Sequence, residues 1–102
     1  PDWSPDGRFI VYSWQPPTRW EHDIYVVEVS TSKIFQLTSR SGSNENPHWS
    51  PDGRHLGFQS ARTGSKQIFI MNADGKNLKQ VTAYGINEAP AWSDYQVAAP
   101  EP

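Results

Sequence analysis

Short apolar segments, separated by turns rich in Gly and Pro, run along most of the chain. In residues 9–14 and 55–60, large apolar side chains two positions apart predict strands with one apolar face. Residues 24–29 and 68–73 are apolar on both faces, which is typical of strands covered on both sides. No segment sustains an apolar period of 3.6 residues, so strands are favoured over helices. The predicted strands are 2–4, 9–14, 24–29 and 34–38, and then 48–50, 55–60, 68–73 and 78–82.

The sequence contains an internal repeat with a period of about 45 residues. Residues 1–8, Pro-Asp-Trp-Ser-Pro-Asp-Gly-Arg, recur at 47–54 with His in place of the first Asp, and a broken third copy begins at Pro90. The repeat divides the chain into units 1–46 and 47–89, followed by 90–102 as the first strand of a third unit and a tail. The residues assigned to the recurring structural motif are Trp3, Pro5, Asp6, Gly7, Arg8, Trp49, Pro51, Asp52, Gly53, Arg54 and Trp92.

The motif residues have structural roles by their position. The recurring Trp is expected to pack between neighbouring repeat units. In the Ser-Pro-Asp-Gly turn, Pro presets φ, and Gly53 is expected in the left-handed region, as is its counterpart Gly7. Asp6 and Asp52 are expected to accept a hydrogen bond from the backbone of their own turn.

Composition and charge exclude several functions. A net charge of −2 argues against a nucleic-acid surface, and the absence of Cys excludes disulfides and thiolate metal sites. No apolar run is long enough for a transmembrane helix, so membrane insertion is not expected. His22, His48 and His55 do not recur in register and lack zinc-ligand spacing. No enzyme signature is found, and no cofactor or metal is expected.

Four antiparallel strands per repeat, with the third covered on both faces, describe an all-β chain of β-propeller blades. The string Trp-Ser-Pro-Asp-Gly-Arg, then Ile-Phe-Ile-Met-Asn-Ala-Asp-Gly, then Val-Thr, then Asn-Glu-x-Pro-x-Trp resembles the TolB-like WD-type propeller repeat over residues 1–93. Closed rings have 4–8 blades, and two blades plus one strand cannot close one. We therefore expect self-association or flanking blades of a longer chain, driven by apolar faces on Tyr25, Val27, Phe69 and Met71.

The resemblance implies a protein-interaction scaffold. Proteins similar to TolB use the propeller as a docking platform in the periplasm or cell envelope, where a peptidoglycan-associated lipoprotein is the family's partner. A protein or peptide partner and no catalysis are therefore expected here. Two alternatives stay open. The chain could be the propeller part of an enzyme, as in prolyl-oligopeptidase-like peptidases or acidic-sugar lyases. It could also be a propeller fragment with no separate activity.

Topology predicts where a partner would bind. The loops between the second and third strands and between successive blades share one end of the blades, at residues 15–22, 39–46, 61–66 and 83–89. We call this the long-loop end. The other end carries only tight turns, with little room for chemistry expected, so function is expected at the long-loop end. The loop 15–22 breaks the repeat in length and in its Trp, Pro and Arg content. The candidate partner-binding residues are Trp14, Arg19, Trp20, His22 and Arg62.

Overall fold

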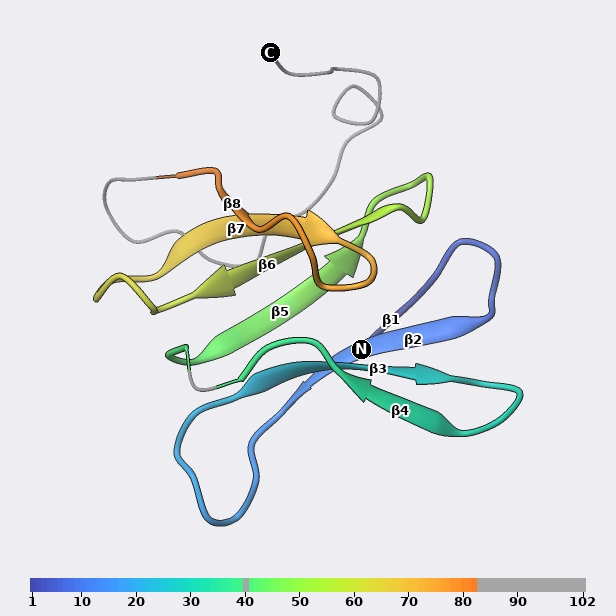
Figure 1. Cartoon of the computed structure of the whole chain (residues 1–102), viewed down its shortest axis with the longest axis horizontal. Helices are drawn as coiled ribbons and strands as arrows, with labels where there is room; N and C mark the ends of the chain where they lie inside the picture. Colours follow the sequence, from blue (N-terminus) through green and yellow to red (C-terminus); the bar gives the residue numbers. More distant parts are fainter. Residues whose placement is uncertain (40, 83–102) are drawn as a thin grey trace.

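Two four-stranded antiparallel sheets, packed one on the other, make up the part of the chain that the structure describes, residues 1–39 and 41–82 (Figure 1). The structure is a computed structural model. Each sheet is a simple meander in chain order, which confirms the predicted all-β propeller blades. The first sheet comprises β1 (Asp2–Trp3), β2 (Phe9–Trp14), β3 (Asp23–Glu28) and β4 (Lys33–Gln36), and the second β5 (Asn44–Trp49), β6 (His55–Ser60), β7 (Gln67–Asn72) and β8 (Lys79–Gln80).

Most predicted strands are confirmed to within a residue or two, and one is corrected. Strands β2 and β6 have the predicted bounds, whereas β5 begins at Asn44, four residues before the predicted start at His48. The early residues of β5 are polar, so no apolar pattern marks them as strand. The division at 46/47 stays a prediction about repeat units, although residues 44–46 belong to the second sheet. Several predicted features lie outside the described residues: the loop 83–89, the strand that begins at Pro90, Trp92 and the tail.

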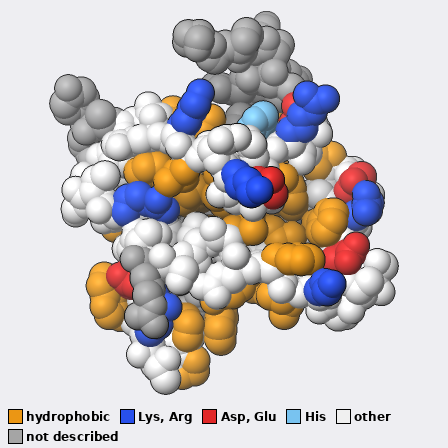
Figure 2. All heavy atoms as spheres, viewed as in Figure 1, with side chains coloured by type: hydrophobic (Ala, Val, Ile, Leu, Met, Phe, Trp, Pro, Cys, Tyr) orange, Lys and Arg blue, Asp and Glu red, His pale blue; other side chains and the backbone are white. Residues whose placement is uncertain are grey.

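The two faces of the first sheet have different surroundings, as the strand register shows. Val11 pairs with Val26, and both are buried against the second sheet, whereas Ile10 pairs with Trp3 and Val27 on the face turned away from it. In the second sheet, Leu56, Phe58, Phe69 and Met71 face the first sheet. Figure 2 shows hydrophobic side chains gathered along the seam between the sheets.

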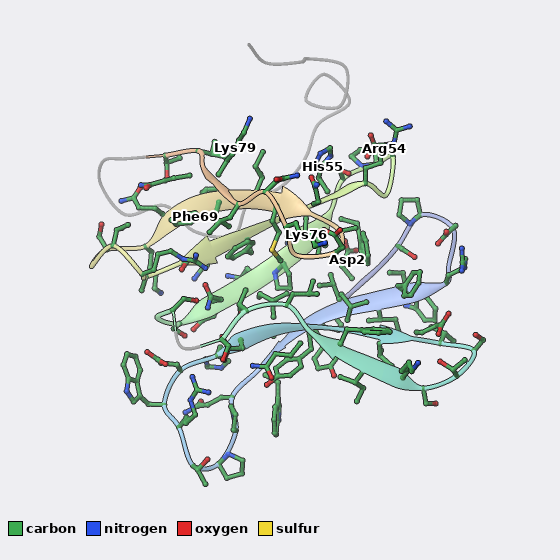
Figure 3. The ribbon with its side chains drawn as sticks, in the orientation of Figure 1. Asp2, Arg54, His55, Phe69, Lys76 and Lys79 are labelled. Atoms are coloured by element: carbon green, nitrogen blue, oxygen red, sulfur yellow. The ribbon has the colours of Figure 1, made fainter. Side chains whose placement is uncertain are left out.

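One expectation about exposed apolar faces is wrong. Phe69 and Met71 are almost fully buried, because this side of β7 turns toward the first sheet (Figure 3). The opposite face of the second sheet carries smaller and more polar groups. Figure 3 shows His55 and Lys79 pointing away from the first sheet. Tyr25 and Val27, by contrast, lie on the outer face of the first sheet and are only partly covered.

The two recurring Trp residues of the described chain differ in their surroundings. Trp49 is 8% exposed and packs against Phe9 of the first sheet, with ring centroids 6.4 Å apart. Trp3 occupies the equivalent position in the first sheet but is 58% exposed, because it lies on the face turned away from the second sheet. Packing between blades is thus seen for Trp49.

Both Pro-Asp-Gly turns have the expected geometry. Gly7 and Gly53 have φ of 75° and 73°, the left-handed region that Gly adopts without strain. Asp6 Oδ1 accepts hydrogen bonds from Ser4 Oγ (2.7 Å) and from the backbone N–H of Arg8 (3.0 Å). These bonds lower the pKa of Asp6, and the same bonds in the second turn lower that of Asp52.

Candidate functional site

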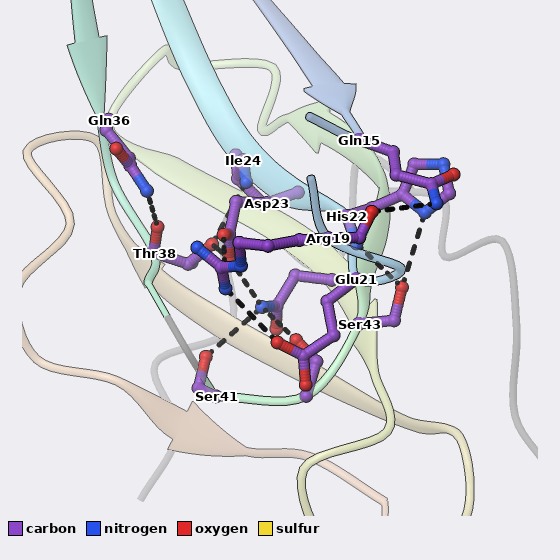
Figure 4. Close-up of polar contacts among 12 residues, drawn as sticks. Gln15, Arg19, Glu21, His22, Asp23, Ile24, Gln36, Thr38, Ser41 and Ser43 are labelled. Atoms are coloured by element: carbon purple, nitrogen blue, oxygen red, sulfur yellow. Dashed lines mark hydrogen bonds and ion pairs between the residues drawn. The ribbon is translucent and has the colours of Figure 1, made fainter. Parts of the chain in front are cut away.

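The long-loop end brings together segments that are far apart in sequence. The backbone N–H of Asn44 donates to the carbonyl oxygen of His22 (2.8 Å), and the N–H of His22 donates to Ser43 Oγ (3.1 Å). The N–H of Ala61 donates to the carbonyl oxygen of Ser43 (3.0 Å). Residues 15–22, 41–46 and 61–66 therefore form one surface, as the topology predicts, and Figure 4 shows the polar contacts around it. The fourth loop, 83–89, lies outside the described residues.

A buried carboxylate lies beneath this surface. Asp23 is fully buried, and its Oδ1 accepts hydrogen bonds from Thr38 Oγ1 (2.7 Å) and Asn44 Nδ2 (3.2 Å). Its Oδ2 has no hydrogen-bond partner but lies 3.6 Å from Arg19 Nη2. A buried charge costs free energy unless a group of opposite charge compensates it. The ion pair between Arg19 and Asp23 therefore holds the loop 15–22 at the start of β3.

Arg62 joins the segment between the two sheets to the second sheet at the same end. Its guanidinium lies over the ring of Phe69, 4.8 Å from the centroid. Its Nη2 donates to Asn44 Oδ1 (3.0 Å) and Ser41 Oγ (3.3 Å), and its Nε donates to Ser60 Oγ (2.9 Å). Burial lowers the pKa of Arg62, an effect that nearby Asp23 opposes. The side chain is thus a half-buried bridge that orders the loops around it.

The loop 15–22 is held by contacts within itself. Arg19 Nη2 lies 3.1 Å from Glu21 Oε1, and the backbone N–H of Arg19 donates to the carbonyl oxygen of Pro16 (3.1 Å). Gln15 Nε2 donates to the carbonyl oxygen of Arg19 (3.0 Å). Between these anchored residues, Trp20 is 73% exposed, the most exposed large hydrophobic side chain among the described residues. The loop therefore presents an indole ring on a braced backbone.

The five candidate residues fall into two groups. Arg19, His22 and Arg62 have internal partners, and His22 Nδ1 lies 3.2 Å from Glu45 Oε2. Trp20 is exposed at the long-loop end. Trp14 is 50% exposed but packs its ring edge against Tyr25 at the outer face of the first sheet. A role in binding stays a prediction for all five.

Sequence reasoning missed three residues that organise the site, Asp23, Asn44 and Glu45. One signal was available for two of them, because Asn44-Glu45 recurs as Asn-Glu at 87–88 in the next repeat. Asp23 has Gln67 at the equivalent position, and Gln67 Oε1 likewise accepts a hydrogen bond from a Thr hydroxyl, that of Thr82 (2.7 Å). This shared hydrogen-bond partner, a Thr hydroxyl, can be recognised only when the pairing of the strands is known.

The tight-turn end is less restricted than the sequence suggested. A cavity of about 500 Å³ opens there between the sheets, so the expectation of little room at this end is wrong. Among residues 1–39 and 41–82, no cluster of three or more His, Asp or Glu could hold a metal ion. The same residues contain no helix long and apolar enough to cross a membrane.

Comparison with known proteins gives a consistent family. The sequence profile of the TolB beta propeller domain family matches residues 1–97. The Tol-Pal system protein TolB of Francisella tularensis subsp. mediasiatica is 40% identical over 84 residues, which cover 80% of this chain and 19% of that protein. A Bacillus subtilis protein named as an uncharacterized peptidase, YuxL, is 32% identical over 100 residues, covering 91% of this chain and 15% of that protein. The chain thus spans about a fifth of the TolB relative.

Solved structures agree with the fold. The structure of a TolB-like protein from Agrobacterium tumefaciens superposes with a TM-score of 0.76 at 35% identity, over 81% of this chain and 29% of that one. TolB from Acinetobacter baumannii superposes with a TM-score of 0.74 at 30% identity, over 86% of this chain and 22% of that one. The TolB relatives are periplasmic Tol-Pal system proteins, which confirms the location that the resemblance implied.

Proposed function

Because the chain belongs to the TolB β-propeller domain family, we propose that it is a non-catalytic protein-interaction scaffold that binds its partner at the long-loop end. The observation that carries this proposal is Trp20, an exposed indole on a loop braced by Arg19. Trp is among the residues that most often dominate binding energy. A braced loop also loses little conformational freedom on binding, so more of the contact energy is retained as affinity.

Two further features support a protein partner at this end. The surface is formed by three loops that are joined to one another by hydrogen bonds. The TolB relatives are named as Tol-Pal system proteins. A peptidoglycan-associated lipoprotein is therefore the first partner to test, with its periplasmic domain as the probe.

The decisive variant is Trp20→Ala. Because the ring is exposed, we expect the free energy of unfolding to stay within about 0.5 kcal/mol of that of the parent chain. The free energy of binding should weaken by about 2 kcal/mol or more. Leu78→Ala is the control, since it removes an exposed apolar side chain that belongs neither to the long-loop end nor to the outer face of the first sheet. Loss of stability with affinity unchanged would contradict the proposal.

The enzyme alternative has one specific observation in its favour, the similarity to YuxL. That similarity covers 15% of the peptidase-named protein, so it concerns a propeller segment and not a whole enzyme. We propose that this chain carries no peptidase activity of its own. Hydrolysis of a chromogenic peptide by the purified chain, abolished by a serine-protease inhibitor, would support the alternative instead.

We further propose that another blade covers the outer face of the first sheet, either from a second copy or from a longer chain. Trp3, Ile10 and Val27 occupy the positions that Trp49, Leu56 and Met71 occupy in the second sheet, where all three are buried by the neighbouring blade. An exposed apolar face of this kind favours association. Light scattering of the purified chain should show association, and a stable compact monomer would contradict self-association.

A further inference from the structure

The cavity between the two sheets opens at the tight-turn end, away from the proposed binding surface. Its walls come from β2, β3, β4 and β5 and from the turns of both blades. Because both blades belong to this chain, the cavity does not depend on any neighbouring blade. Its volume of about 500 Å³ lies within the range of ligand-binding pockets. The apolar lining residues are Pro5, Phe9, Val26, Phe35, Leu37, Trp49 and Ala73.

Among residues 1–39 and 41–82, every ionisable group that lines this cavity is a carboxylate. Asp6 and Asp52 come from the two Pro-Asp-Gly turns, and Asp74 comes from the turn between β7 and β8. All three are exposed, so they lie at the rim while the buried Trp49 and Val26 lie deeper. Ser4 and Ser50 donate hydrogen bonds to Asp6 and Asp52, which lowers the pKa of both carboxyls further below neutral pH.

Basic residues accompany these carboxylates but do not line the cavity. Arg8, Arg54 and Lys76 each follow the turn carboxylate by two positions, and none of them is among the lining residues. Arg8 lies over the ring of the lining residue Phe9, 5.4 Å from the centroid, and the charges of Arg8 and Arg54 contribute to the lowered pKa of Asp6 and Asp52. Among the described residues, the ionised side chains that line the cavity itself are carboxylates, which are complementary to an apolar group that carries a positive charge at one end.

We propose that this cavity, which we call the turn-end cavity, binds a peptide segment of a partner protein in which an aromatic or aliphatic side chain adjoins Arg or Lys. The apolar side chain enters between the sheets, and the cation lies at the rim beside the carboxylates. A cation there gains hydrogen bonds to ionised acceptors, which are stronger than neutral ones. The inference is independent of the proposed long-loop surface, since the two sites lie at opposite ends of the blades.

The test uses three dipeptide probes, acetyl-Phe-Arg-amide, acetyl-Phe-Gln-amide and acetyl-Phe-Glu-amide, titrated into the 102-residue chain and followed by amide NMR shifts. We expect shifts at the cavity residues Gly53, Ala73 and Phe35, with the Arg probe binding about fivefold or more tighter than the Gln probe. The Glu probe should be the weakest. Equal binding of the three probes, shifts confined to residues 15–22, or no shift up to the solubility limit would overturn the proposal.

A triple variant separates charge from fold. This variant combines Asp6→Asn, Asp52→Asn and Asp74→Asn. Each Asn keeps a side-chain oxygen that can accept the hydrogen bonds of its turn, but the negative charges at the rim are removed. We expect the preference for the Arg probe to fall to less than about twofold. Glu28→Gln, which removes a carboxylate outside the cavity, should keep the preference. If the triple variant melts far below the parent, the single variant Asp74→Asn is used, and an unchanged preference in it would count against the proposal.

Discussion

The indole Nε1–H of Trp49 donates a hydrogen bond of 3.0 Å to the backbone carbonyl oxygen of Asp2. The backbone N–H of Trp49 also donates to Asp2 Oδ2 (2.9 Å). One residue of β5 is thereby bonded twice to one residue of β1, so the first strands of the two blades are fixed in relative position. Trp49 thus joins the two blades by directed bonds as well as by apolar packing.

Replacing Trp49 by Phe tests this connection. Phe keeps most of the apolar contact with Phe9 but leaves the Asp2 carbonyl without its indole donor, so we expect a loss of roughly 1–3 kcal/mol in the free energy of unfolding. Trp3→Phe is the matched control at the equivalent, exposed position and should change stability by less than about 0.5 kcal/mol. Urea unfolding followed by circular dichroism measures both. Equal losses would show that the inter-blade bond contributes nothing specific.

Gly53→Val tests the turn geometry. The backbone at Gly53 has φ of 73°, a conformation strained for a β-branched residue, so we expect destabilisation of roughly 1–3 kcal/mol. A Cβ there would meet only Pro5, with Cδ at 3.5 Å and Cγ at 3.9 Å, which is ordinary contact. Gly7→Val has open space around its Cβ and nearly the same φ, so it should cost a similar amount. An unchanged thermal midpoint in both variants would contradict the turn assignment.

The strands and turns could be predicted because they depend on local residues that recur. Strand β2 and the loop 15–22 have the predicted bounds, since the apolar pattern and the turn residues define them without distant contacts. The early part of β5 could not be predicted. Asn44 belongs to this strand through its pairing with Ser60 of β6, and its side chain bonds to Asp23 of β3 and to Arg62, contacts that no local pattern marks. A register shift between Glu45 and His48 further obscures the pattern.

The candidate site was predictable only in outline. Topology alone placed the long loops at one end, and the unrepeated Trp20 marked one of them as special. The buried Asp23 and its contact with Arg19 depend on side-chain geometry, which the repeat does not encode. The turn-end cavity depends on how the two sheets separate at one end, whereas the tight turns alone predict little room for chemistry there.

Arg62 should stabilise the assembly of the loops more than its position in a loop suggests. Arg62→Ala leaves Asn44 Oδ1 without this donor and uncovers the ring of Phe69, so we expect a loss of roughly 1–3 kcal/mol. Arg62→Lys keeps the charge but loses the planar fork and should recover only part of this loss. Thermal unfolding of the two variants gives the comparison. Full recovery by Lys would show that charge alone matters at this position.

The turn carboxylates should make stability depend on acidic pH. Asp6 and Asp52 have a pKa lowered from the ordinary value of 3.8 when folded. Their contribution is therefore present above the unfolded value and lost as the pH falls through the folded value. We expect the melting temperature to fall as the pH is lowered below about 4, and to fall less in the variant with Asp6→Asn and Asp52→Asn. Identical pH profiles would mean that these carboxylates do not contribute.

Amide hydrogen–deuterium exchange, with and without the periplasmic domain of a peptidoglycan-associated lipoprotein, tests the proposed binding face most directly. The account predicts slower exchange in the complex at residues 15–22, 41–43 and 61–66, centred on Trp20, with the turns at 5–8, 51–54 and 72–76 unchanged. Protection confined to those turns, or no protection at the three loops at saturating partner, would contradict it.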